Sequence, residues 1–167
     1  MKTSILALAL LSSVTLVKAD NLTTSEKQFV DKAAAANIAE IELAQLAQRK
    51  SQDSKIKAFA DRMIIDHNKA NNDLKAIADA AHIGISDRLE GESKAAYEKL
   101  EKLDGSSFDR SYISDMVTDH QKAAAEYEKE RGEVKSPNLK AYVDNTLVAV
   151  QNHLSMAEEV QKNITSR

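Results

Sequence analysis

The stretch FADRMIIDHNKA at residues 59–70 recurs as YISDMVTDHQKA at residues 112–123, without a gap and with eight positions identical or similar. In each copy an aromatic residue, a methionine, a histidine and an alanine follow at spacings of four, four and three residues. Such spacings place the four side chains on one face of an α-helix. Helices of a bundle often have similar apolar patterns, which explains the shared spacing. This does not explain an Asp-His pair at the same place in both copies.

Outward from these copies, glycine and proline interrupt the chain only where helices are expected to begin or end. Thr23 and Glu26 have the spacing of a capping box. Ser136 and Pro137 have the pattern of a cap followed by the first residue of a helix. We therefore predict four long helices and one short one. Their expected ranges are 23–50, 53–81, 92–103, 106–132 and 137–164.

Four long helices of similar length predict an all-α four-helix bundle. The segment 82–105 is much longer than a tight helix–helix connection, and it carries the short extra helix. We expect this segment to cross the length of the bundle. The long helices would then follow an up-down-down-up order instead of a simple up-down-up-down order.

The first 19 residues have the pattern of a secretory signal peptide. Lys2 gives a positive start, residues 5–17 are mostly apolar, and Ala19 ends the expected cleavage motif. The apolar run is shorter than the roughly 20 residues that span a bilayer, so no membrane span is expected. We predict cleavage after Ala19, a bundle domain over residues 20–167, and a periplasmic or secreted protein. Loss of two lysines, Lys2 and Lys18, takes the net charge from −3 to −5.

Composition excludes several classes of function. The chain has no cysteine, which excludes disulfides, thiolate metal sites and cysteine nucleophiles. Its net charge of −3 argues against a nucleic-acid partner. No Gly-rich phosphate loop and no serine in a nucleophile-elbow setting are present. The sequence therefore selects no enzymatic activity.

Three of the four histidines and one glutamate fall in the middle of apolar helix faces. They are Glu40, His67, His120 and His153. Glu40 and His153 are each about 17 residues into their helices, and the other two histidines about 14. At about 1.5 Å per residue, all four are within about one turn of mid-helix. We therefore predict that they meet in one layer at the centre of the bundle.

A carboxylate and three imidazoles in an apolar core are costly unless they are paired or bind a metal. Such ligands suit zinc, iron or copper. Asp66 and Asp119 each directly precede a histidine, and we expect them to be hydrogen-bond partners of ligands or members of interhelix salt bridges instead of ligands themselves. The alternative is a layer of hydrogen-bonded acidic and histidine side chains that fixes the helix register without a metal. The sequence leaves both open.

Five blocks of the chain carry a family resemblance. They are NIAEIELAQLA at 37–47, Phe59-Ala-x-x-Met63 with Asp66-His67, Gly105-x-x-Phe108-Asp109-x-x-Tyr112, Asp119-His120, and His153-Leu154. In these blocks, over about residues 25–160, the chain resembles the domain-of-unknown-function family 4142. Members of that family are labelled outer membrane proteins and are similar to ferritin-like bundles. The resemblance implies a ferritin-like four-helix architecture with a long crossover, and it implies no activity.

Ferritin-like di-iron proteins use a Glu-x-x-His motif from each of two helices. Here Ile64, Val117 and Val150 stand three residues before the histidines. A mononuclear site is therefore the better metal hypothesis. Two functions stay open. One is an exported bundle that binds one transition metal through a layer of three histidines and one glutamate. The other is a non-metal structural or partner-binding protein of the bacterial envelope with a stress-linked role, its partner being a second copy or another envelope protein.

Overall fold

The computed structural model describes residues 21–165, which form five α-helices. The long helices are α1 (Thr24–Lys50), α2 (Ser54–Ala80), α4 (Gly105–Glu133) and α5 (Pro137–Thr165), with 27 to 29 residues each. Helix α3 (Gly91–Glu101) is short, with 11 residues. The predicted signal peptide, residues 1–19, lies outside the described residues. In the part that is described, no helix has an apolar stretch long enough to cross a membrane.

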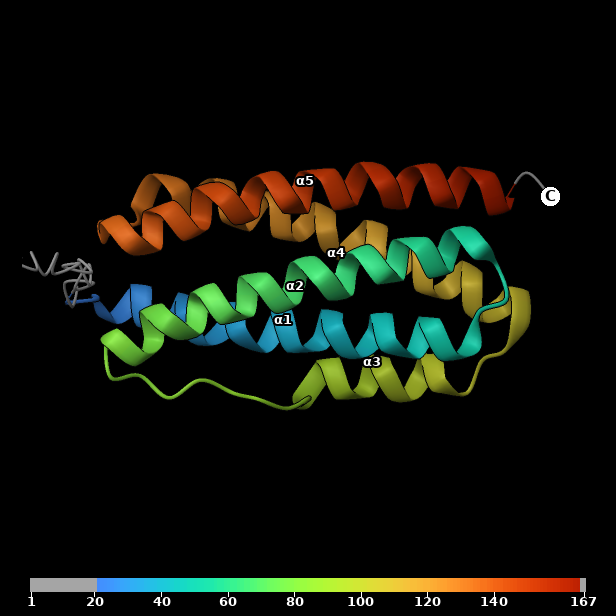
Figure 1. Ribbon diagram of the computed structural model, residues 1–167, viewed down its shortest axis with the longest axis horizontal. Coiled ribbons are helices and arrows are strands. Elements are labelled where there is room, and N and C mark those ends of the chain that lie inside the picture. Colours follow the sequence, from blue (N-terminus) through green and yellow to red (C-terminus); the bar gives the residue numbers. More distant parts are fainter. Residues whose placement is uncertain (1–20, 166–167) are drawn as a thin grey trace, which may run out of the picture.

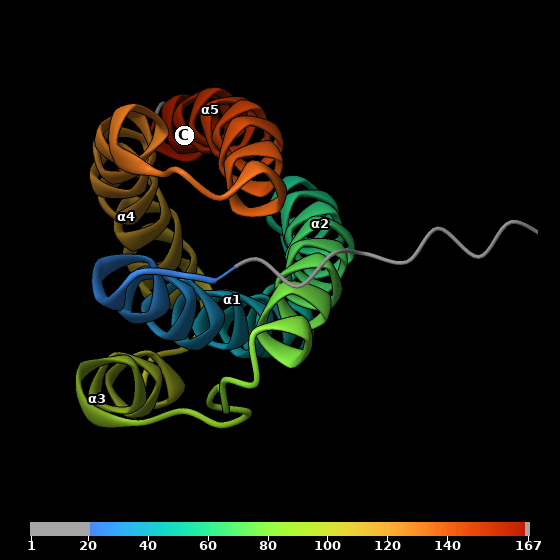
Figure 2. The ribbon, with the colours of Figure 1, turned by 90° about the vertical axis from the view of Figure 1, so that its left-hand side faces the viewer.

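Seen end-on, the four long helices form a ring, and α3 lies outside it beside α1 (Figure 2). Helices α1 and α5 run in one direction along the bundle, whereas α2 and α4 run in the other (Figure 1). Helix α1 packs mainly on α2, α4 packs mainly on α5, and contacts between α2 and α5 join the two pairs. The connection between α2 and α4 returns along the bundle and contains α3. The predicted four-helix bundle with a long crossover is confirmed.

Side-chain caps explain where the helices begin. Thr23 Oγ1 accepts a hydrogen bond from Glu26 N at 3.2 Å, and Glu26 Oε2 accepts one from Thr23 N at 2.8 Å, so the predicted capping box is confirmed. At the start of α5, Ser136 Oγ accepts from Leu139 N at 3.2 Å. Pro137 is the first residue of that helix, where its missing N–H costs nothing. All helix ends lie within two residues of the ranges expected from the sequence.

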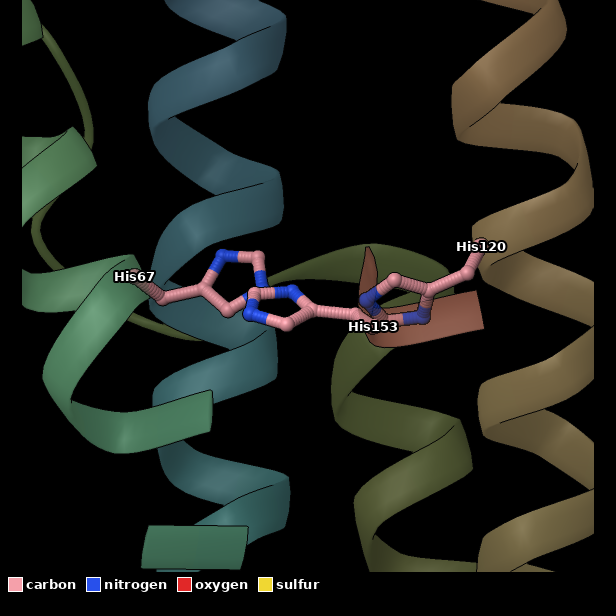
Figure 3. Close-up of side chains that lie close together, drawn as sticks. All are labelled: His67, His120 and His153. Atoms are coloured by element: carbon pink, nitrogen blue, oxygen red, sulfur yellow. The ribbon is translucent and has the colours of Figure 1, made fainter. Parts of the chain in front are cut away.

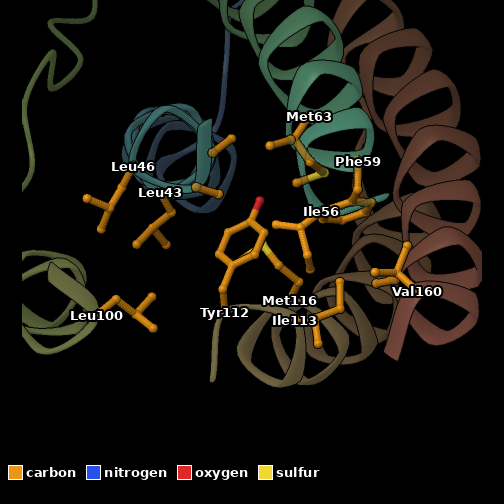
Figure 4. Packing of buried hydrophobic residues seen from close by; sticks show 14 of the residues in the cluster. Leu43, Leu46, Ile56, Phe59, Met63, Leu100, Tyr112, Ile113, Met116 and Val160 are labelled. Carbon is orange, nitrogen blue, oxygen red and sulfur yellow. The ribbon is translucent and has the colours of Figure 1, made fainter. Parts of the chain in front are cut away.

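A layer of three histidines divides the core of the bundle (Figure 3). On one side lies a cluster of apolar residues near the C-terminal half of α1, which we call the α1 C-terminal cluster (Figure 4). It includes Leu43, Leu46, Phe59, Met63, Tyr112 and Met116. On the other side lies the α1 N-terminal cluster, which includes Phe29, Val30, Leu74, Tyr127 and Leu139. The histidine layer is therefore enclosed by apolar packing at both of its ends.

Candidate metal centre

His67, His120 and His153 converge from α2, α4 and α5 in the middle of the bundle (Figure 3). Their side chains are buried, with 7%, 2% and 2% of their surface exposed. The ring centroids are 5.3 to 6.0 Å apart. One nitrogen from each ring can be taken so that the three nitrogens all lie within 4.8 Å of one another. The predicted meeting of the three histidines in one layer is confirmed.

Each imidazole has one nitrogen beside an oxygen that can only accept a hydrogen bond. The pairs are His67 Nδ1 with Asn37 Oδ1 at 3.0 Å, His120 Nδ1 with Met116 O at 2.9 Å, and His153 Nε2 with Asp66 Oδ2 at 2.8 Å. Since amide, peptide and carboxylate oxygens carry no proton, the ring nitrogen must donate in each pair. A neutral imidazole then has a lone pair on its other nitrogen. The second nitrogens are Nε2 of His67, Nε2 of His120 and Nδ1 of His153.

Two of these second nitrogens have no hydrogen-bond partner. His67 Nε2 and His153 Nδ1 are both buried, and neither receives a hydrogen bond. Buried polar atoms without a partner are rare in folded proteins, and each costs about 1–3 kcal/mol. The same arrangement, in which a histidine donates outward and keeps its other nitrogen free, is typical of histidines that bind a metal.

Burial keeps these imidazoles neutral. It lowers the pKa of His67 well below the usual 6.5, and the neighbouring His153 and His120 lower that pKa further. Burial also lowers the pKa of His153, although the hydrogen bond to Asp66 partly opposes the effect. Both rings are therefore neutral at pH 7, which is the form of histidine that binds metal ions.

The outward hydrogen bonds are themselves held in place. Asp66 Oδ2, which accepts from His153, also accepts from Arg62 Nε at 2.6 Å. Asn37 Nδ2 donates to Tyr142 Oη at 3.2 Å, which fixes the amide oxygen toward His67. These contacts fix the rotation of both rings before any ion arrives.

The predicted carboxylates behave differently from one another. Asp66 accepts a hydrogen bond from His153 on α5, and not from His67, which follows it in the sequence. Asp119 instead pairs with Lys122 at 3.2 Å on the surface, and within residues 21–165 it is hydrogen-bonded to no histidine. Glu40 is absent from the group of donor atoms formed by the three histidines in the described chain. The structure therefore shows a cluster of three histidines without Glu40, and Asp119 paired with a lysine.

Glu40 lies beside the layer and not in it. Its side chain is half-buried, and its Oε2 atom is buried without a hydrogen-bond partner. Burial raises the pKa of Glu40, and the nearby His120 acts in the opposite direction. Glu40 is therefore close enough to His120 to interact with it electrostatically.

Two partners of the histidines were not predicted from the sequence, the Asn37 side chain and the Met116 carbonyl. The bond from Arg62 to Asp66, which holds the acceptor of His153, was not predicted either. Asn37 could have been found, because it lies three residues before Glu40 and so on the same face of α1. A carbonyl inside a helix carries no signal of this kind.

Comparison with known proteins agrees with this architecture. The family model described as "Domain of unknown function (DUF4142)" matches residues 12–160. Among solved structures, the chain is similar to the crystal structure of a DUF305 fragment from Deinococcus radiodurans. The TM-score is 0.78 at 17% sequence identity, and the match covers 86% of this chain and 99% of that one. At this identity the similarity concerns the fold alone. No curated protein matches the chain. Because the family model covers most of the sequence, the chain belongs to the DUF4142 family.

Proposed function

We propose that the protein binds one first-row transition-metal ion, of the zinc, copper or iron group, through His67, His120 and His153. The observation that carries this proposal is the convergence of three buried rings that each donate one hydrogen bond outward, with the second nitrogens of His67 and His153 buried and without a partner. Neutral imidazole suits these metals, and the chain offers no thiolate to compete.

The non-metal alternative explains the layer less well. A layer held only by hydrogen bonds would pair the inward nitrogens with protein donors, but His67 Nε2 and His153 Nδ1 have none. A metal ion satisfies all three nitrogens at once. It also offsets the cost of burying the two nitrogens that have no hydrogen-bond partner.

The spacing of the rings fits one ion after a small adjustment. Nitrogens bound to one tetrahedral zinc ion at about 2.0–2.1 Å lie roughly 3.4 Å apart. In this structure one nitrogen from each ring lies within 4.8 Å of the other two. Binding one ion therefore shortens each nitrogen–nitrogen distance by at most about 1.5 Å. Glu40 lies outside the group, so we propose a set of three histidines with a free fourth position, in place of a set that includes the glutamate.

We also propose that the protein works outside the cytoplasm after its signal peptide is removed. Lys2, the apolar residues 5–17 and Ala19 support this proposal. Intact-mass analysis of protein from the bacterial envelope tests it. A chain that begins at Asp20 is expected, and a chain that still begins at Met1 would contradict it.

Elemental analysis and thermal unfolding test the metal. We expect about one ion per chain and a rise in Tm on adding zinc, copper or iron(II), because a ligand at 100 times its Kd stabilises a protein by about 2.7 kcal/mol. Single substitution of His67, His120 or His153 by Gln should abolish both effects. His82→Gln is the control, since His82 lies at the end of α2, away from the layer. The proposal fails if the wild-type protein binds none of these ions and its Tm does not move.

A further inference from the structure

The three histidines come from α2, α4 and α5, so α1 contributes no ligand to the proposed metal. Of the four long helices, α1 is the one that supplies none of the three histidines. Figure 3 shows this helix behind the rings. Asn37 of α1 is already engaged by His67 and Tyr142. Glu40 is the polar side chain of α1 at this level that still has a buried atom without a partner.

The register of the helices places Glu40 close to His120. Lys32 of α1 pairs with Glu126 of α4, and the two helices run in opposite directions. By this register, Glu40, eight residues further along α1, is expected near the level of Thr118, and it lines one groove together with Asp119, the residue before His120. The electrostatic effect of His120 on the pKa of Glu40 agrees with this placement.

A groove reaches Glu40 from the surface. It encloses about 480 Å³ between α1, α3 and α4. Its lining is partly apolar and partly charged, and besides Glu40 the charged residues are Lys32, Glu92, Asp119, Lys122 and Glu126. It exists because α1 packs mainly on α2 and α4 mainly on α5, while α3 lies outside the ring (Figure 2). The groove is lined by Glu40 and by none of the three histidines, so it gives solvent an approach to Glu40 on this side of the bundle.

We propose that the fourth position of the metal is open toward Glu40 and holds an exchangeable small ligand with an oxygen or nitrogen donor, which enters through the groove between α1, α3 and α4. In the resting protein this ligand is water. A metal-bound water donates hydrogen bonds, and the unpartnered Glu40 Oε2 is an acceptor in the right part of the core. Exchange replaces one neutral or anionic donor by another, without a redox step. This inference rests on the proposed metal site.

Azide binding to the cobalt(II)-loaded protein tests the open position. Azide should change the visible spectrum and saturate. Glu40→Gln should keep the Kd for cobalt within about tenfold of wild type, because Glu40 is not a ligand. At a pH above the raised pKa of Glu40 it should strengthen azide binding at least about threefold, because the ionised carboxylate repels an anion held beside it.

Two tryptophan substitutions test whether the ligand enters through the groove between α1, α3 and α4. Ala36 is exposed and lines the groove near Glu40, whereas Ala58 is also exposed and lines a different groove between α2 and α5. We expect Ala36→Trp to slow azide entry at least about tenfold in stopped-flow measurements, and Ala58→Trp to leave the rate unchanged. Circular dichroism and the cobalt Kd show whether each variant is folded and loaded.

The outcomes separate this inference from the metal proposal. If the wild-type protein binds no cobalt, both are wrong. If cobalt binds but azide leaves the spectrum unchanged, the metal proposal stands and the open position is wrong. If Glu40→Gln weakens cobalt binding more than about 100-fold, Glu40 is a direct ligand and the inference is overturned. Equal azide rates in the two tryptophan variants would refute the route.

Discussion

The carboxylate of Glu26 joins the beginnings of two helices, and its removal should destabilise the bundle in a way that depends on pH. Oε2 accepts from Thr23 N at 2.8 Å, within the capping box of α1. Oε1 accepts from Lys135 N at 2.8 Å and Ser136 N at 2.9 Å, in the connection that leads into α5. Burial by itself raises the pKa of Glu26, but these backbone hydrogen bonds outweigh it and lower the pKa from 4.5 to about 2.

The sign and size of the effect follow from linkage. The folded-state pKa is below the unfolded one, so the contribution is fully present above about pH 4.5 and is lost as the pH falls toward 2. A difference of about 2.5 pKa units corresponds to about 3 kcal/mol of unfolding free energy at neutral pH. Glu26→Gln removes the charge that responds to pH. We therefore expect it to cost about 3 kcal/mol at pH 7, and less than half of that near pH 3.

Urea unfolding of the metal-free protein, followed by circular dichroism at a series of pH values, measures this difference. Protonation of the buried histidines affects both proteins equally, so it cancels from the difference. Glu158→Gln is the matched control, because Glu158 is exposed on α5. A cost that stays constant between pH 7 and 3, or that is below about 0.5 kcal/mol at pH 7, would refute the role assigned to Glu26.

Three further predictions concern the layer and the end of α2. Asp66→Asn replaces the charged acceptor of His153 by a neutral one, and it should weaken metal binding about 10–100-fold in a competition titration with a chelator. The metal-free protein should lose stability as the pH falls below 6.5, because the lowered pKa values of His67 and His153 let the unfolded chain bind protons that the folded chain excludes; a Tm that is constant from pH 7 to 5 would contradict this. His82→Gly should stabilise the protein by up to about 1 kcal/mol in urea, because His82 has φ 55° just after α2.

Most of the fold could be predicted from the sequence because its signals are local. Thr23 and Glu26 define the start of α1 through contacts three residues apart, and Ser136 with Pro137 does the same for α5. The crossover followed from the length of the segment between α2 and α4. None of these inferences requires knowledge of how one helix packs on another.

The histidines could be predicted for a related reason. The position of a residue in its helix indicates its level along the bundle axis, and the apolar spacing indicates which face of the helix is buried. His67, His120 and His153 were therefore expected in the core at one level. The contacts of Asp66 and Asp119 could not be predicted in this way, because these residues lie about 100° around the helix from the histidines. At that rotation, Asp66 faces α5 and reaches His153, whereas Asp119 reaches Lys122 at the surface. The two copies of Asp-His are alike in sequence, and only the neighbouring helix distinguishes them.

Glu40 and Asn37 show the same limit on α1. Both lie on one face and near one height, and the sequence favoured the carboxylate as a ligand. In the structure the amide reaches a histidine, while the carboxylate lies toward the groove between α1, α3 and α4. The choice between them depends on the rotation of α1 about its axis, which is set by packing along its whole length.

Three of the four long helices supply the histidines of the proposed site, and α1 supplies none. A metal held by His67, His120 and His153 would tie α2, α4 and α5 together at mid-length, where the two apolar clusters are separated. Helix α1 would be held to α4 by no such bond, and its main packing is on α2. Metal binding would therefore stiffen three sides of the bundle and leave unchanged the side where the groove lies. A fourth protein ligand from α1 would close that side. Without such a ligand, the uncovered face of the ion would lie on the side of the groove.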